Sequence, residues 1–461
     1  MSQYLNQNLA NPTLTRPPSK ITPGEEFLLS PQDRNYNRQY YTMYQYRFAA
    51  LKSRIEVKAL EKWGDGVRRI DGQTIFKQDK ILDISSGKLC WVIGTVFIDA
   101  PGKLNILKDV DNGVDDVLPS VPETYVGGES GVIMLEDESG RAILSNSEFL
   151  DKNLLVTGCV VGVLGIEIQA GVFEIMDVVY PASNSQTEKI VEDSSSTSKV
   201  ALVSGLNISS IDDLKIELLK QYLIGELGSN EDKQFNGGIG QLIIAGDSIE
   251  PLKQEKGQDF MSTNNYGTKN ISKYNTDSLK KLQEFVNDVI VSLPIAVMPG
   301  ANDPGEICLP QQPLHRSLVG NLSYGDRLTR LTNPQWMNID GLKLLGSSGQ
   351  NIDDIKKYLK KEEHTEATID IMKSAIKWQN IAPTAPDTLY CYPYDNSDPF
   401  IIKDDVPHIF FVGNQDKYAS EVFKYNGSVT TLISLPKFSE TGQFVVVDLK
   451  TLECEVVEIE C

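Results

Sequence analysis

The spacing of apolar residues changes several times along the chain and divides it into segments. Residues 1–30 are polar and contain four prolines, so we expect a flexible N-terminal tail, with local docking as the alternative. Between Gln39 and Trp63 apolar residues recur at helical spacing. This pattern predicts a helix whose apolar face is formed by Tyr41, Tyr44, Phe48, Leu51 and Ile55.

From Leu82 to Pro181 the apolar pattern becomes that of short strands. Residues Asp137 to Gly140 predict a hairpin turn, and glycines interrupt the remaining runs. Five or so short strands in about 100 residues favour a small barrel of the OB type. With the preceding helix, it forms a first domain over 31–182. The predicted strands are 89–97, 131–135, 141–144, 154–161 and 172–176.

A serine-rich stretch, 183–198, reads as a linker, and the pattern changes again after it. Short runs that are apolar on both faces alternate with helical segments, which begin at about Asp212 and Asp277. Ser210 is placed to cap the N-terminus of the first of these helices. This alternation predicts a layered α/β domain over 199–461. The buried runs are 200–203, 241–245, 294–298, 341–345, 388–391 and 408–412, and antiparallel strands follow at 429–435, 443–448 and 453–457.

Charge restricts the classes of partner. The 461 residues include 44 Lys+Arg and 63 Asp+Glu, a net charge of −19, and the stretch from Leu82 to Tyr180 has 16 acidic against 5 basic residues, a net of −11. Binding to a phosphate backbone needs clustered positive charge, so we expect little direct nucleic-acid binding and favour protein contact by the barrel. The chain has no run of ~20 apolar residues and no apolar leader, so we expect a soluble intracellular protein.

The candidate chemistry lies where the predicted buried strands end, because ligands of open α/β sheets bind beyond the strand C-termini. Glycine, asparagine, aspartate and serine occupy these loops, but histidine does not. The chain has three histidines, His315, His364 and His408, and no two have the spacing of a local metal pair. The positions are Gly205, Asn207, Asp247, Ala301, Asn302, Asp303, Ser348, Asn414 and Asp416.

These loops resemble those of the calcineurin-like metallophosphoesterase superfamily, which hold two metal ions. On that pattern Gly205 and Asn207 replace Asp and His, Asp247 keeps the bridging carboxylate, and Asp303 is retained. Ala301 and Asn302 replace the Asn-His pair, Ser348 stands near a lone His, and Asn414 and Asp416 replace two histidines. The resemblance implies an inactivated site without catalytic residues, metal or cofactor. A single weak Mg²⁺ or Ca²⁺ at Asp247 and Asp416, or an active phosphoesterase with unusual ligands, is the alternative.

Five further segments occur in order and resemble the B-subunit family of replicative DNA polymerases, most closely the branch that serves DNA polymerase delta. The resemblance implies a fold of class α/β plus all-β, in which an inactive calcineurin-like phosphoesterase sandwich domain follows an N-terminal OB-type barrel. The segments are 298–304, 309–315, 331–334, 345–354 and 382–388.

The resemblance also implies a function: a non-catalytic scaffold subunit in DNA replication and repair, located in the nucleus. Its partners would be the C-terminal cysteine-rich module of the polymerase delta catalytic subunit, a third accessory subunit, and the polymerase zeta catalytic subunit. One proline-rich loop is a structural brace or a partner-binding surface, and bracing is favoured. Its residues are Leu309, Pro310, Gln311, Gln312, Pro313, Leu314 and His315.

Overall fold

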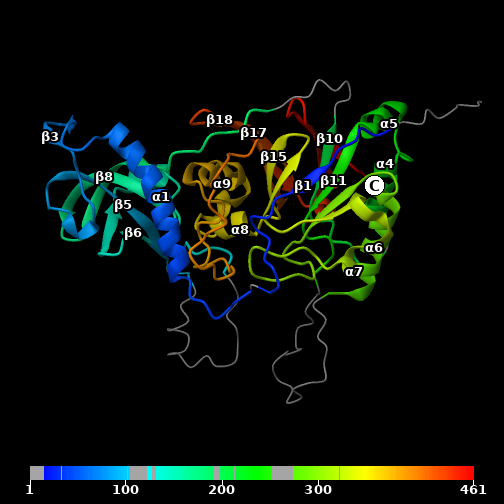
Figure 1. The fold of residues 1–461 in the computed structure, drawn as a ribbon, viewed down its shortest axis with the longest axis horizontal. Helices are drawn as coiled ribbons and strands as arrows, with labels where there is room; N and C mark the ends of the chain where they lie inside the picture. The colour runs from blue at the N-terminus through cyan, green and yellow to red at the C-terminus, as the bar shows by residue number, and fades with distance from the viewer. Residues whose placement is uncertain are drawn as a thin grey trace, which may run out of the picture.

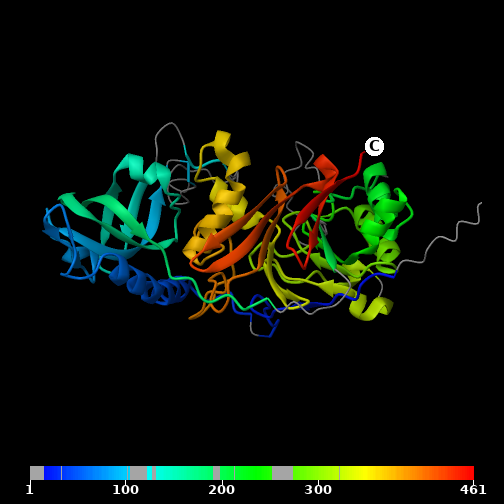
Figure 2. The same cartoon turned by 90° about the horizontal axis from the view of Figure 1, so that it is seen from above.

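A computed structural model describes residues 15–460 except 33, 101, 104–121, 127–130, 190–197, 212, 252–273 and 321. A barrel lies at one end of the long axis and a larger sandwich of sheets lies at the other (Figure 1). The view from above shows the same succession, with the N-terminal helix along the barrel (Figure 2). No helix in the described part of the chain is long and apolar enough to span a membrane.

The barrel strands follow the order β4-β5-β6-β7-β9-β8, and a further β5–β8 pairing closes the ring. This arrangement agrees with the predicted OB-type barrel. Its strands are β4 (Phe76–Lys77), β5 (Leu89–Asp99), β6 (Val132–Glu136), β7 (Arg141–Ser145), β8 (Val160–Gln169) and β9 (Val172–Val179). Smaller elements nearby are β2 (Arg69–Ile70), β3 (Gln73–Thr74), η1 (Ile81–Asp83) and α3 (Ser147–Lys152).

Helix α1 (Tyr41–Lys62) packs along the barrel, as the apolar spacing predicts, but with a different face. Tyr41 is exposed, and Tyr44 and Phe48 are only partly buried. Leu51 and Ile55 do lie in the core with Trp91 of β5. The buried positions are Met43, Arg47, Leu51, Ile55 and Ala59.

The sandwich consists of two six-stranded mixed sheets. The first has the order β1-β14-β15-β16-β18-β17 and the second the order β13-β12-β11-β10-β19-β20. Strands of the first are β1 (Ile21–Pro23), β14 (Gln335–Ile339), β15 (Leu342–Ser347), β16 (Ile409–Gln415), β17 (Ala419–Tyr425) and β18 (Ser428–Pro436). Those of the second are β10 (Lys199–Val203), β11 (Ile239–Ala245), β12 (Ile295–Met298), β13 (Leu328–Arg330), β19 (Gln443–Asp448) and β20 (Cys454–Glu458).

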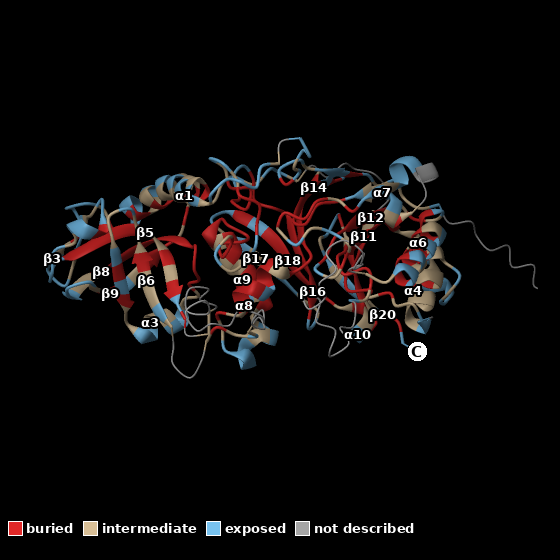
Figure 3. Ribbon diagram, turned by 90° about the horizontal axis from the view of Figure 1, so that it is seen from below, coloured by how far each residue is buried: buried red, intermediate tan, exposed pale blue. Residues whose placement is uncertain are grey.

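Apolar side chains fill both the space between the sheets and their outer faces. Leu202 and Ile243 of the second sheet meet Leu344 and Phe411 of the first. Helices cover the two outer faces, so the layers are α/β/β/α, and central strands such as β11 and β16 are buried along their whole length (Figure 3). The helices are α4 (Leu214–Ile224), α5 (Asn230–Gly237), α6 (Thr276–Ile290), α7 (Arg316–Val319), η2 (Leu322–Arg327), α8 (Gln350–Lys356), η3 (Lys361–Glu363), α9 (His364–Trp378) and α10 (Phe438–Thr441).

The expectation of a flexible tail over 1–30 is wrong for residues 15–30, and residues 1–14 lie outside the described part. Strand β1 pairs antiparallel with β14 and extends the first sheet. Phe27 is fully buried, and its ring lies 6.1 Å from that of Phe400. Backbone pairing and one buried aromatic ring therefore hold a segment whose prolines and polar residues suggested disorder.

Local predictions fail in three further places. The strand expected at 154–161 begins only at Val160, where β8 starts. Asp213, rather than Ser210, caps α4, because its side chain accepts from Lys215 N. The run 388–391 forms no strand and contributes only an isolated bridge between Cys391 and Leu309. In the segment read as a linker, residues 183–189 lie along the sandwich, where Thr187 N donates to Asp405 Oδ1 at 2.8 Å.

Candidate functional site

The loops after five strands of the two sheets meet at one end of the sandwich. Gly205 N donates to Gly246 O and Asn207 N donates to Asp247 O, both at 3.0 Å. The first sheet reaches the same place, because Asn414 N donates to Ser204 Oγ at 2.9 Å. The structure thus brings together the sequence-predicted positions on the loops after β10, β11, β12, β15 and β16, with the exception of the Asp416 side chain.

The two retained carboxylates are buried, and the chain's own N–H groups occupy their oxygens. Asp247 accepts from Asn302 N at 2.9 Å and from Asn302 Nδ2 at 3.1 Å. Asp303 accepts from Gly300 N at 2.8 Å through one oxygen and from Ser248 N at 2.8 Å through the other. These carboxylates therefore brace loops.

Burial dominates the electrostatics of this pair. Desolvation raises the pKa of Asp247, against the lowering by Asn302 and by the Lys437 ammonium. Desolvation, with the neighbouring charge of Asp247, raises the pKa of Asp303 to about 7, although three backbone N–H groups oppose the shift. The carboxyl group of Asp303 is therefore partly protonated near neutral pH.

Backbone conformation and hydrogen bonds fix several other positions of this group. Asn207, Asp247 and Asn414 have positive φ angles of 45°, 52° and 59°, a rare conformation for residues other than glycine. Asn414 Nδ2 donates to Ser348 O at 2.8 Å, and the Ser348 hydroxyl contacts Asn333 Nδ2 at 2.7 Å. Ala301 is exposed and offers only a methyl group.

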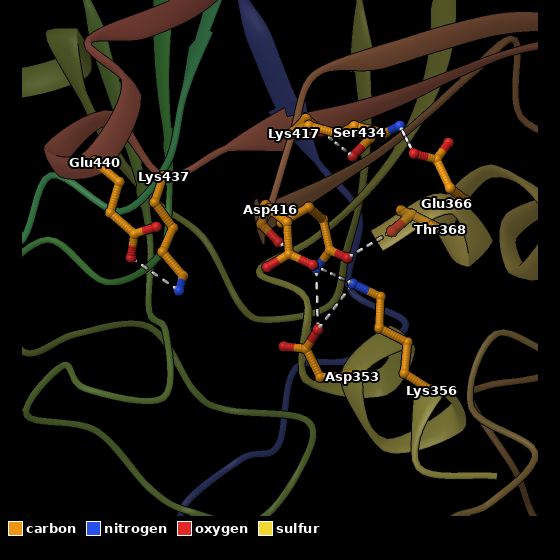
Figure 4. A network of polar contacts seen from close by, with 11 residues as sticks. Asp353, Lys356, Glu366, Thr368, Asp416, Lys417, Ser434, Lys437 and Glu440 are labelled. Atoms are coloured by element: carbon orange, nitrogen blue, oxygen red, sulfur yellow. Dashed lines mark hydrogen bonds and ion pairs between the residues drawn. The ribbon is translucent and has the colours of Figure 1, made fainter. Parts of the chain in front are cut away.

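Asp416 does not join the group. Its carboxylate lies 3.5 Å from Lys356 Nζ of α8, and half of its side-chain surface is exposed. Figure 4 shows Asp416 and Asp353 near the Lys356 ammonium, which lies 3.9 Å from the Asp353 carboxylate, and Gln415 Nε2 donates to Asp353 Oδ1 at 3.3 Å. In this structure the Asp416 carboxylate is thus paired with Lys356 and does not contact Asp247 in any interaction described.

Lys437 and Ser439 were missed by the sequence reasoning and border the site. Phe438 N donates to Ser204 O at 2.9 Å, Ser439 N donates to Gly205 O at 3.0 Å, and Asn207 Nδ2 donates to Ser439 Oγ at 2.9 Å. The segment directly follows the predicted strand 429–435. The strand 429–435 was expected to be antiparallel, so the loop after it was not considered. The rule that ligands bind beyond strand C-termini would have located this segment if applied to that strand.

The loop 309–315 stabilises the site through hydrogen bonds of its glutamine side chains. Gln311 Nε2 donates to Gly300 O at 3.0 Å, and its Oε1 accepts from Asn333 Nδ2 at 2.7 Å. Gln312 accepts from Leu29 N at 2.8 Å and so holds the N-terminal segment. Leu309, Pro310, Gln311, Gln312 and Leu314 are buried, Pro313 is partly buried, and His315 is exposed.

The donor set does not fit a pair of metal ions. One position has no side chain, one has a methyl group, and Asp247 and Asp303 are already hydrogen-bonded. Amide and hydroxyl oxygens carry no charge to balance two close cations. Across the described ranges no three His, Cys, Asp or Glu residues gather as a metal-binding group.

Comparisons with known proteins give the class first. A family model for the B-subunit of DNA polymerases alpha and epsilon matches residues 200–420, and one for the OB-fold domain of the DNA polymerase delta subunit matches residues 39–178. The sandwich and the barrel are thus those of a polymerase B-subunit. The chain belongs to the family of DNA polymerase delta small subunits.

Three relatives cover most of the chain. The DNA polymerase delta small subunit of Saccharomyces cerevisiae is 35% identical over 94% of this chain and 92% of its own length. That of Arabidopsis thaliana is 37% identical over 82% and 83%, and DNA polymerase delta subunit 2 of Drosophila melanogaster is 29% identical over 92% and 94%. A solved archaeal phosphodiesterase aligns with 57% of this chain and 99% of its own, at 10% identity and a TM-score of 0.26, which is too low to support an argument.

Proposed function

We propose that the chain is a non-catalytic scaffold subunit of DNA polymerase delta, and that its phosphoesterase-like site is inactive. One observation carries the second part: every oxygen of Asp247 and Asp303 already accepts an N–H from the chain. Displacing these bonds would leave buried polar groups of two loops without hydrogen-bond partners. Family membership supports the first part.

In this proposal the scaffold consists of two domains, residues 31–182 and residues 199–461. Together they bridge the C-terminal cysteine-rich module of the catalytic subunit and a further accessory subunit, and the complex acts in the nucleus. The same surfaces also serve the polymerase zeta catalytic subunit. The net charge of −11 between Leu82 and Tyr180 supports protein contact rather than contact with DNA.

The loop 309–315 has a bracing role in this scaffold. Its glutamines bond to Gly300, Asn333 and the backbone of the N-terminal segment. We restrict direct partner contact on this loop to His315, whose side chain is exposed.

Co-purification tests the scaffold. The full chain is co-expressed with a polymerase delta catalytic subunit, either intact or lacking its C-terminal cysteine-rich module. We expect a stable complex with the intact subunit and none with the truncated one. Recovery of two separate proteins in the first case would count against the proposal.

The alternative is an active phosphoesterase or nuclease, favoured by the retained Asp247 and Asp303. Elemental analysis of the purified chain and a nuclease assay in Mn²⁺ distinguish the two, with Asp247→Ala as control. Stoichiometric metal and an activity that disappears on substitution would establish the alternative. We expect neither metal nor an activity that depends on Asp247.

A further inference from the structure

Two buried side-chain oxygens of the emptied site accept no hydrogen bond from the residues that the structure describes. Asn414 Oδ1 and Asn207 Oδ1 are closed off from solvent and have no hydrogen-bond partner among the residues that the structure describes. The amide of Asn414 is oriented, because its Nδ2 donates to Ser348 O at 2.8 Å. Buried acceptors that lack donors are unfavourable, so these oxygens point to a missing donor or cation.

Lys437 borders the same space. A methyl group built on Gly205 would lie 2.8 Å from Asn414 Oδ1 and 2.9 Å from Lys437 Cβ. Gly205 has a φ of 61° and no side chain, and this absence keeps the space open. The lysine stem and the unpaired oxygen therefore face one small volume, on the side of the site where Asp247 lies.

Lys437 has a weak alternative contact. Its Nζ lies 3.1 Å from Glu440 Oε1, where a third of the lysine side chain and 61% of the glutamate side chain are exposed (Figure 4). An exposed pair of this kind contributes little, and four rotatable bonds let the ammonium turn toward the site. The Lys437 charge already acts on the buried carboxylate of Asp247, whose pKa it lowers against the effect of burial.

We propose that Lys437 is a tethered cation that takes the place of a metal ion in the emptied site. Its ammonium leaves Glu440 and donates to Asn414 Oδ1, Asn207 Oδ1 and the carboxylate of Asp247. Three N–H donors then meet three acceptors. This assignment goes beyond the scaffold function and does not depend on assembly with a polymerase.

A double-substitution cycle on the full chain tests the contact. Lys437→Met removes the ammonium and keeps the stem, and Lys417→Met is the control, since Lys417 likewise forms an ion pair with an exposed glutamate. We expect Lys437→Met to lower the melting temperature by at least about 2 °C more than Lys417→Met. In an Asp247→Asn background most of this difference should disappear. Equal effects of the two lysine substitutions, or an unchanged difference in the Asp247→Asn background, would overturn the proposal.

A cation provides a second readout, which remains usable if Asp247→Asn does not fold. Millimolar Mn²⁺ should raise the melting temperature of the Lys437→Met chain, because the vacated oxygens then accept an ion. The unsubstituted chain should respond less, since its own ammonium competes. An equal response of both chains, including no response in either, contradicts a tethered cation.

Discussion

At the scale of single residues, Asp303 predicts how stability varies with pH. Its pKa of about 7 in the folded chain exceeds the usual 3.8, because of burial and of Asp247. The folded state therefore holds a proton that the unfolded state has lost, and the contribution of Asp303 to stability decreases as pH rises from about 4 to 7. Below about pH 4 that contribution is complete.

Asp303→Asn removes this dependence. Denaturant unfolding at about pH 5 and about pH 8 should show a destabilisation by Asp303→Asn that is larger at the lower pH, by on the order of 2 kcal/mol. The comparison at two pH values cancels the constant effect of the amide. An equal destabilisation at both would show that the carboxylate is ionised throughout.

Gly205 predicts that no side chain is tolerated at this position of the loop after β10. Gly205→Ala adds a Cβ 2.8 Å from Asn414 Oδ1 and 3.0 Å from Lys437 Cα, at a φ of 61°. Strain and overlap together should reduce the free energy of unfolding by about 2–3 kcal/mol. The control is Gly171→Ala, which has a φ of 78° and nothing within 4 Å, and should cost about 1 kcal/mol. Similar losses in both would attribute the effect to the backbone alone.

At this scale the sequence predicted which residues lie at the candidate site, but not the direction in which each side chain points. Strand-end loops located Asp247, Asn207 and Asn414 correctly, because parallel strands end at a common edge. The direction of Asp416 was not predictable, since Lys356 comes from a helix of another segment. Lys437 was missed because it follows β18, a run expected to be antiparallel, whereas β18 pairs parallel with β16 and ends beside Ser204.

At the scale of elements, Phe27 predicts how firmly the N-terminal segment is held. Its side chain is fully buried, whereas the adjacent Leu28 is 52% exposed. Phe27→Ala should cost about 3–5 kcal/mol of unfolding free energy, and Leu28→Ala about 0.5 kcal/mol or less. Chemical denaturation of the two variants measures the difference. Equal small losses would mean that the segment detaches without unfolding the sandwich.

Helix α1 illustrates why the apolar pattern identified elements more reliably than faces. Five apolar positions predicted its extent within two residues, yet one of the five buried positions is Arg47. An arginine is compatible with that face only because Asp398 lies 351 positions further along the chain and accepts from its Nε at 2.6 Å. Local sequence contains no information about such a partner, so the predicted stripe was displaced toward Tyr44 and Phe48.

At the scale of the whole molecule, the barrel and the sandwich share one core. A single buried cluster includes Cys90 and Val163 of the barrel together with Phe400 and Trp378 of the sandwich. The N-terminal segment crosses from one to the other and ends in α1. The scaffold role proposed above would require such coupling, because a flexible connection would leave the relative positions of two bound partners undefined.

The buried ion pair between Arg47 and Asp398 predicts how strongly the two parts are coupled. Both side chains are almost wholly buried, and Arg47 also donates to Pro383 O at 2.8 Å. Arg47→Met leaves an uncompensated carboxylate in this interface and should cost about 3–5 kcal/mol. Calorimetry should then resolve two unfolding transitions, one for the barrel and one for the sandwich, whereas we expect a single transition for the unsubstituted chain.

Arg47→Met combined with Asp398→Leu should restore most of the lost stability, because no unpaired charge remains. Lys152→Met, in the exposed pair with Glu148, should change stability by about 0.5 kcal/mol or less. A single transition in Arg47→Met, with a loss no larger than that control, would place the coupling in the apolar core alone.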